Sequence, residues 1–325
     1  MRNANRNAGI SLVRTTAFAC AAVFAAVSAW AETYYWSAGS GTWSTPGNWT
    51  VGEERTPATS APGTEDDVFI LAESGTITVT YKEAITVKSL EIGGAGGTAV
   101  LSSETIEPFQ VTGDCTILTN GKVTHKAGDT KELYKVFLMV GGDMTITEGG
   151  KVDVSGCGGS GAGRSNDNPY GYEVAAHGGE AADHRLNTRL CYGSVRYPFN
   201  YGSQGGYANG GGAAMLSVAG TLRVDGSILA EPSTNSSRNG SGGSIWIEAG
   251  ELLGGGVISA QALATGQGCG GGGRIAVKLT NAGADFSAPV WTGTITDLRD
   301  GGLHCGRRRG RADAREYGGG PGVDA

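Results

Sequence analysis

Apolar and polar residues alternate over many short stretches of this chain. Residues 222–225 read Leu-Arg-Val-Asp, and residues 245–248 read Ile-Trp-Ile-Glu. A period of two places successive side chains on opposite faces of a β-strand, so that one face is buried and the other meets solvent. The pattern therefore predicts short strands with the apolar residues directed inward.

The alternating stretches recur at a fixed interval between residues 202 and 279. Each unit has a glycine cluster, a short apolar strand, a glycine and a second apolar strand, and Met215, Ile245 and Ile275 are spaced by 30 residues. A period of this size is typical of a solenoid, in which each repeat buries its apolar face against its neighbours. The residues expected in the core are Met215, Leu216, Val218, Leu222, Val224, Ile245, Ile247, Ile258, Ile275 and Val277.

Similar strands precede this region. Segments rich in β-branched residues predict strands at 67–71, 76–80, 85–87, 89–92, 109–111, 115–118, 136–140, 144–146 and 152–154. Residues 140–146 (Val-Gly-Gly-Asp-Met-Thr-Ile) align with residues 218–224 (Val-Ala-Gly-Thr-Leu-Arg-Val). Because no linker separates the two halves, we expect a single domain over residues 32–298.

Glycine runs separate the strands and allow tight turns. Residues 240–247 read Gly-Ser-Gly-Gly-Ser-Ile-Trp-Ile, and residues 270–277 read Gly-Gly-Gly-Gly-Arg-Ile-Ala-Val. These segments resemble the glycine-rich coils of right-handed parallel β-helix (pectin-lyase-like) domains in large bacterial secreted and autotransporter-type surface proteins. The resemblance covers about residues 36–279 and implies an all-β fold, namely a right-handed parallel β-helix or β-solenoid.

The two ends of the chain differ from this body. Arg2, Arg6 and Arg14 precede an apolar run, and Ala29-Trp30-Ala31 supplies small residues for a signal peptidase, so residues 1–31 are expected to be a signal peptide. A membrane anchor is the alternative, but the run is shorter than the ~20 residues that span a bilayer. No other segment is long and apolar enough to span a membrane. The mature chain is thus expected to be secreted or at the cell surface.

Composition and charge limit the class of partner. The chain has 58 glycines among 325 residues and a net charge of -6, and its one basic cluster lies at residues 306–315. A body with this charge is not expected to bind nucleic acid. Residues 299–325 lack a strand period and core-forming residues, so we expect a disordered basic tail.

Three tryptophans, Trp36, Trp43 and Trp49, lie in the segment 36–50 at the start of the mature chain. Indole faces can stack on sugar rings. Alternatively, bulky aromatics can cover the open end of a solenoid. We favour an N-terminal cap.

The segment 156–206 interrupts the strand pattern and is predicted to be a long loop insertion. Long loops on a rigid scaffold often carry function. The loop contains several tyrosines and two of the four histidines, and the candidate binding residues are Tyr170, Tyr172, His177, Asp183, His184, Tyr192 and Tyr197. The alternative is that the loop covers the strands, with its tyrosines buried against them.

The chemistry of this loop is weakly specified. His177 and His184 do not have an established zinc spacing, and no carboxylate and basic set typical of β-helix enzymes is evident. We therefore predict no metal, no cofactor and no catalytic residue. Cys157 and Cys191 bracket the loop, so a disulfide could close its base, the alternative being that both thiols are free.

Taken together, these features predict an exported structural or adhesive surface protein without catalytic activity. Cell-surface glycans or polysaccharides are the expected partners. One alternative is a carbohydrate-active enzyme, a polysaccharide lyase or hydrolase, on the same scaffold. Another is a passenger module of a larger autotransporter-like protein.

Overall fold

The computed structural model describes residues 31–127, 131–159, 175–179, 181–183, 188–189, 191–205, 208–233, 240–262, 268–284 and 294–296. The predicted tail 299–325 and residues 1–30 of the predicted signal peptide lie outside them. Over the described ranges the fold is all-β, as expected, and its one helix is the short 3-10 helix η1 (Pro46–Asn48). None of these residues belongs to a helix that could cross a membrane.

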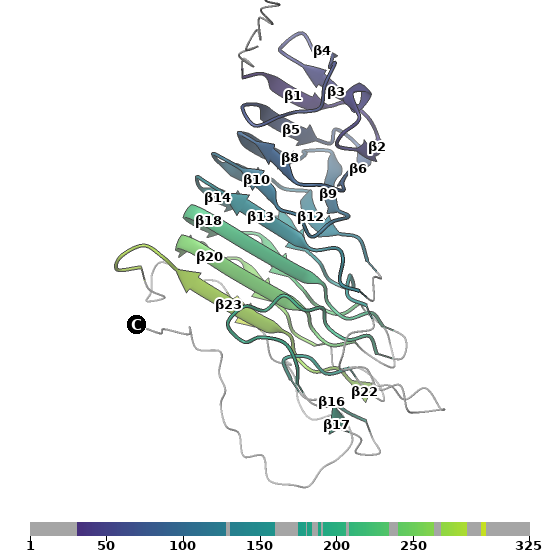
Figure 1. Ribbon diagram of the computed structural model, residues 1–325, viewed down its shortest axis with the longest axis vertical. Coiled ribbons are helices and arrows are strands. Elements are labelled where there is room, and N and C mark those ends of the chain that lie inside the picture. Colours follow the sequence, from purple (N-terminus) through teal and green to yellow (C-terminus); the bar gives the residue numbers. More distant parts are fainter. Residues whose placement is uncertain are drawn as a thin grey trace, which may run out of the picture. The chain divides into compact units, whose positions relative to one another are not determined.

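The largest sheet has 13 strands, most of which pair in parallel (Figure 1). Only the pairs β1–β3 and β3–β4, at one end of the sheet, are antiparallel. The strands of this sheet are β1 (Thr33–Trp36), β3 (Trp49–Val51), β4 (Thr56–Pro57), β5 (Asp67–Leu71), β7 (Ile85–Val87), β8 (Ser89–Gly93), β10 (Phe109–Val111), β11 (Cys115–Ile117), β13 (Val136–Val140), β14 (Met144–Ile146), β18 (Ala213–Val224), β20 (Ser244–Leu253) and β23 (Arg274–Leu279).

A second sheet has eight strands, all parallel, and a third has three antiparallel strands. The second sheet comprises β2 (Ser40–Thr42), β6 (Gly75–Tyr81), β9 (Gly97–Ser103), β12 (Gly121–His125), β15 (Lys151–Asp153), β19 (Ser227–Leu229), β21 (Val257–Ser259) and β24 (Thr294–Thr296). The third comprises β16 (Ala181–Asp183), β17 (Thr188–Arg189) and β22 (Gly268–Cys269).

The chain passes repeatedly between the two larger sheets. It leaves β8 for β9, returns through β10 and β11, leaves again for β12, and returns through β13 and β14. On the large sheet, Leu90, Cys115, Met144, Leu222 and Leu252 are successive partners on neighbouring strands, and all five side chains are buried. We call this row the inward ladder.

The predicted alignment of residues 140–146 with residues 218–224 is confirmed. Val140 pairs with Val218, and Met144 pairs with Leu222. The long strand β18 is thus the neighbour of both β13 and β14, although the segment 156–206 separates them from it in the sequence. The insertion leaves the pairing on either side in register.

The predicted spacing of 30 residues holds for part of the repeat only. Ile245 pairs with Ile275, but the partner of Ile245 on β18 is Ala214, 31 residues earlier. The register shifts between Val218 and Thr221, and Leu222 and Leu252 are again 30 apart. Because of this irregularity, the prediction that Met215 lies in the core is wrong, since it is only partly buried and pairs with the similarly placed Trp246.

The other predicted core residues behave largely as expected. Two of them, Ile275 and Val277 on β23, are partly buried and pack against the core. The fully buried ones are Leu216, Val218, Leu222, Val224, Ile245, Ile247 and Ile258.

The tryptophans of the segment 36–50 are buried. Trp49 packs edge-on against Trp36 and Trp43, with ring centroids 4.9 and 4.8 Å apart, and its indole Nε1 donates a hydrogen bond to the carbonyl oxygen of Trp43 at 2.8 Å. Trp43 also contacts the buried ring of Phe109. Rings enclosed in this way present no open face to a sugar, which favours the capping interpretation over stacking.

Gly211 offers a test of the close approach between backbones. A Cβ atom at this position would overlap the carbonyl oxygen of Ala230, and it would lie 2.5 Å from the amide nitrogen of Gly243. We expect Gly211→Ala to lower the free energy of unfolding by about 3 kcal/mol, the scale of overpacking in a close-packed interior. Urea unfolding would measure the change. Gly47→Ala is the matched control, because a Cβ there meets no atom within 4 Å, and equal stability of the two variants would contradict the packing described.

Candidate functional site

The predicted binding loop is described in part. His177, Tyr192 and Tyr197 are described with their side chains. Tyr170, Tyr172 and His184 lie outside the described residues, and Asp183 is described only through the backbone of β16.

His177 is completely buried. Its Nδ1 lies 2.8 Å from the carbonyl oxygen of Gly242, which can only accept, so Nδ1 carries the proton and donates this hydrogen bond. The other ring nitrogen, Nε2, is then an acceptor, and it is buried without a hydrogen-bond partner. Burial lowers the pKa of His177 to about 4, so the imidazole is neutral at pH 7. It is enclosed by the protein and does not face a ligand on the surface.

Tyr192 connects the loop to the strands. Its ring lies 4.8 Å from that of His177, centroid to centroid, and its hydroxyl donates to the carbonyl oxygen of Tyr201 at 2.5 Å. The carbonyl oxygen of Tyr192 in turn accepts a hydrogen bond from Arg274 Nε of β23 at 2.9 Å. Burial raises the pKa of the Tyr192 hydroxyl. These contacts give Tyr192 a structural role.

The end of the loop is also packed against the body. The ring of Tyr201 is stacked on that of His125, with centroids 5.2 Å apart, and its hydroxyl donates to the carbonyl oxygen of Tyr134. His125 Nε2 accepts a hydrogen bond from the amide of Ala213 at 3.2 Å. His177, Tyr192 and Tyr201 thus follow the alternative in which the loop covers the strands.

Tyr197 differs from these residues because its side chain is 59% exposed. Its ring packs edge-on against Trp246 of β20, with centroids 6.0 Å apart. Trp246 pairs with Met215 of β18, which pairs with Phe137 of β13, so the three form a row across neighbouring strands.

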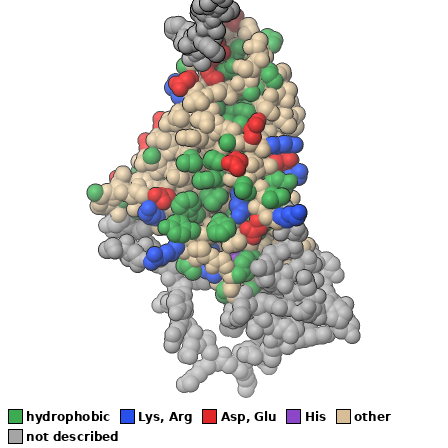
Figure 2. Space-filling model, viewed as in Figure 1, with side chains coloured by type: hydrophobic (Ala, Val, Ile, Leu, Met, Phe, Trp, Pro, Cys, Tyr) green, Lys and Arg blue, Asp and Glu red, His purple; other side chains and the backbone are tan. Residues whose placement is uncertain are grey.

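Phe199, 46% exposed, follows Tyr197 in the loop, and Lys135, next to β13, holds its ammonium nitrogen 4.7 Å from the centroid of the Phe199 ring. We call Phe137, Tyr197, Phe199, Met215 and Trp246 the outer platform. Figure 2 shows apolar side chains gathered on the face formed by β13, β18 and β20.

The sequence carried a signal for this platform that the analysis of the loop alone missed. Trp246 occupies an outward position in the alternating pattern of residues 245–248, where a polar residue is usual. A large aromatic side chain on the solvent face of a strand marks a candidate contact surface. Met215 was assigned to the core, and Phe137 was not singled out.

The predicted bridge between Cys157 and Cys191 is not formed. Both residues are free cysteines in the structure. The Cys157 side chain is buried, with its Sγ 3.7 Å from Thr124 Oγ1, whereas Cys191 is exposed. Burial raises the pKa of the Cys157 thiol, which makes it less reactive. Within the described ranges, no group of three or more His, Cys, Asp or Glu side chains could hold a metal ion.

Comparisons of this chain with family models, with curated proteins and with solved structures found no match.

The two buried histidines predict a pH dependence of stability. Burial lowers the pKa of both His125 and His177 to about 4, whereas an unfolded histidine titrates near 6.5. Between these values the unfolded chain binds more protons, so their contribution is present above pH ~6.5 and is lost as the pH falls towards ~4. At pH 5 the loss is about 2 kcal/mol for each histidine.

Chemical denaturation at pH 7 and pH 5 would measure this difference. In His177→Gln, which retains an amide donor for Gly242, we expect the change in stability between the two pH values to shrink by about 2 kcal/mol. The comparison within one variant removes the effect of the substitution itself. The same pH response in the variant and the parent would contradict the buried neutral state of His177.

Proposed function

We propose that this chain is an exported, non-catalytic adhesive protein of the cell surface, built as a right-handed parallel β-helix, which binds glycans through the outer platform. Export rests on the basic and apolar pattern of residues 1–31. The fold and the site rest on separate observations.

The β-helix accounts for the path of the chain. The strands of the two larger sheets pair in parallel with partners one or more repeats away, and the chain alternates between the sheets. Crossovers between parallel strands of one sheet are right-handed in almost all known folds. A right-handed β-helix joins both sheets into one continuous repeat.

The outer platform carries the proposal of adhesion. Tyr197 and Phe199 are exposed, and Tyr197 packs on Trp246 of β20. Aromatic rings match the apolar faces of sugar rings, and a strand holds Trp246 in place before any ligand binds. Next to it, Glu248 accepts an ion pair from Lys278 at 3.1 Å, which gives the platform a polar border. An apolar centre with a polar border is suited to a ligand that has both kinds of surface.

A binding role is favoured over catalysis by the state of His177. This imidazole was the predicted group closest to acid–base chemistry, and it is buried and hydrogen-bonded to main chain. A general base must come within hydrogen-bond reach of the proton that it removes. His177 has no such access to a ligand on the surface.

We expect Trp246→Ala and Tyr197→Ala each to weaken binding to a responsive glycan about 10-fold, since each removes one ring of the platform. A glycan array followed by calorimetry on the responding glycan would measure the affinities. Ile106→Ala is the matched control, because Ile106 is 50% exposed and lies between β9 and β10, outside the platform.

Platform variants that bind as tightly as Ile106→Ala would contradict the proposed site. The same glycans, incubated with the purified protein, separate adhesion from the enzymatic alternative. We expect no release of reducing or unsaturated ends, and sustained release would contradict the non-catalytic role.

A further inference from the structure

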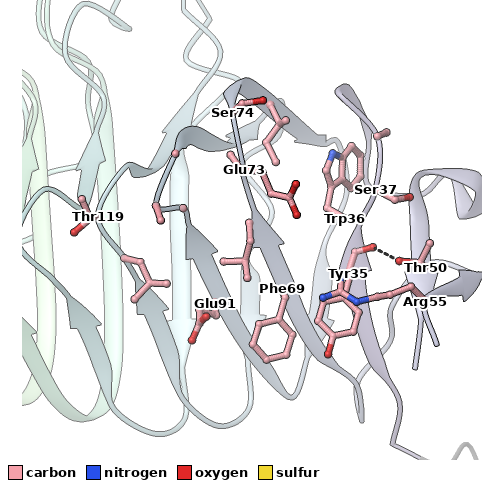
Figure 3. A pocket seen from close by; sticks show the side chains of 18 of the residues that line it. Tyr35, Trp36, Ser37, Thr50, Arg55, Phe69, Glu73, Ser74, Glu91 and Thr119 are labelled. Carbon is pink, nitrogen blue, oxygen red and sulfur yellow. Dashed lines mark hydrogen bonds between the residues drawn. The ribbon is translucent and has the colours of Figure 1, made fainter. Parts of the chain in front are cut away.

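An open groove with a volume of about 1170 Å³ lies at the opposite end of the strand order from β23 (Figure 3). It follows the turns where β1, β5, β8, β11 and β14 of the large sheet lead to the second sheet. These five strands are direct neighbours. At the usual spacing of parallel strands, the groove extends across about 19 Å.

A stack of three side chains forms one wall. Tyr35 and Phe69 are partners on β1 and β5, and their rings are stacked with centroids 5.2 Å apart. The guanidinium of Arg55 lies 3.1 Å from the centroid of the Tyr35 ring (Figure 3). Neighbouring rings and strand pairing fix this wall before a ligand arrives.

Carboxylates and hydroxyls supply the polar part of the lining. Glu91 follows Phe69 in the register, on β8, and Glu73 lies in the turn after β5. Among the described residues, no cation forms an ion pair with either carboxylate. Hydroxyls of Thr119 and Thr147 donate to main-chain carbonyl oxygens, which leaves their oxygens as acceptors for a ligand.

We propose that this groove binds a neutral polysaccharide along several consecutive sugar rings. Sugar rings combine apolar faces with hydroxyl donors, and the groove combines an aromatic wall with carboxylate and hydroxyl acceptors. Its extent across five strands suits an extended chain better than a single sugar. The site is separate from the outer platform, which lies on β13, β18 and β20, and does not rest on the function proposed for that platform.

The charges of the lining disfavour an acidic polysaccharide. Two carboxylates, Glu73 and Glu91, line the groove against one guanidinium. That guanidinium, on Arg55, is already held over Tyr35. A polyanion would meet like charge here, whereas a neutral chain can donate its hydroxyls to the carboxylates.

The strand pairing disfavours a peptide. Extended peptides commonly bind by adding a strand to a free sheet edge. Here β1, β5, β8, β11 and β14 each have a paired neighbour on both sides. The main-chain groups beneath the groove are therefore committed to the sheet, and recognition falls to the side chains.

Affinity electrophoresis of the whole protein in gels that contain a neutral β-glucan, a neutral galactan or polygalacturonate tests this inference. We expect retardation by at least one neutral polymer and none by polygalacturonate. Phe69→Ala is expected to weaken that retention about 10-fold, the loss of one aromatic contact. Glu91→Gln, which keeps the shape of the side chain, is expected to weaken it about 5-fold through the loss of a charge-assisted hydrogen bond.

Trp246→Ala separates this site from the outer platform. Retention by the groove ligand should be unchanged in this variant, even if the platform binds nothing, so the two proposals can fail independently. Thermal midpoints of all variants show that they are folded. Equal retention of the parent, Phe69→Ala and Glu91→Gln would overturn the inference, as would retardation by polygalacturonate alone. Binding to an extended-peptide array in the absence of any neutral glycan ligand would also overturn it.

Discussion

The fold depends on the register of apolar side chains across parallel strands. In the inward ladder, Leu90, Cys115, Met144, Leu222 and Leu252 lie on neighbouring strands, and each buries its side chain against the next. A shift of one residue on any strand would turn its apolar set to solvent. The register therefore fixes which positions face inward and which remain available on the surface. It also explains how the long insertion is tolerated, because the pairing of Met144 with Leu222 resumes after it.

Both proposed sites use positions that the ladder leaves outward. Trp246 and Met215 alternate with buried residues of β20 and β18, and Tyr35 and Phe69 do so on β1 and β5. Parallel strands lie about 4.8 Å apart, so outward side chains at the same register position stack into rows. Rows of this kind build an extended surface from residues that are far apart in the sequence. The loop adds Tyr197 to one such row, while its other described aromatics hold it in place.

Much of the fold could be predicted from the sequence, because a period of two reports directly on which side chains are buried. The strand segments of the large sheet and the alignment of residues 140–146 with 218–224 followed from it. Met215 was misassigned because a register irregularity between Val218 and Thr221 leaves no trace in residue spacing. The burial of His177 depends on how the loop folds back, and the stack of Tyr35 on Phe69 depends on pairing across 34 residues. Neither contact has a local sequence signal.

Methyl contacts between Met144 and Leu222 test the central claim, that distant segments pair in parallel with their apolar residues in register. Nuclear Overhauser measurements on protein labelled at methionine and leucine methyl groups would report them. The structure predicts a direct cross-peak between these two residues, which are 78 positions apart in the sequence and partners in the sheet. If Met144 showed cross-peaks only to methyl groups of its own half of the chain, the register, and with it both surface sites, would be contradicted.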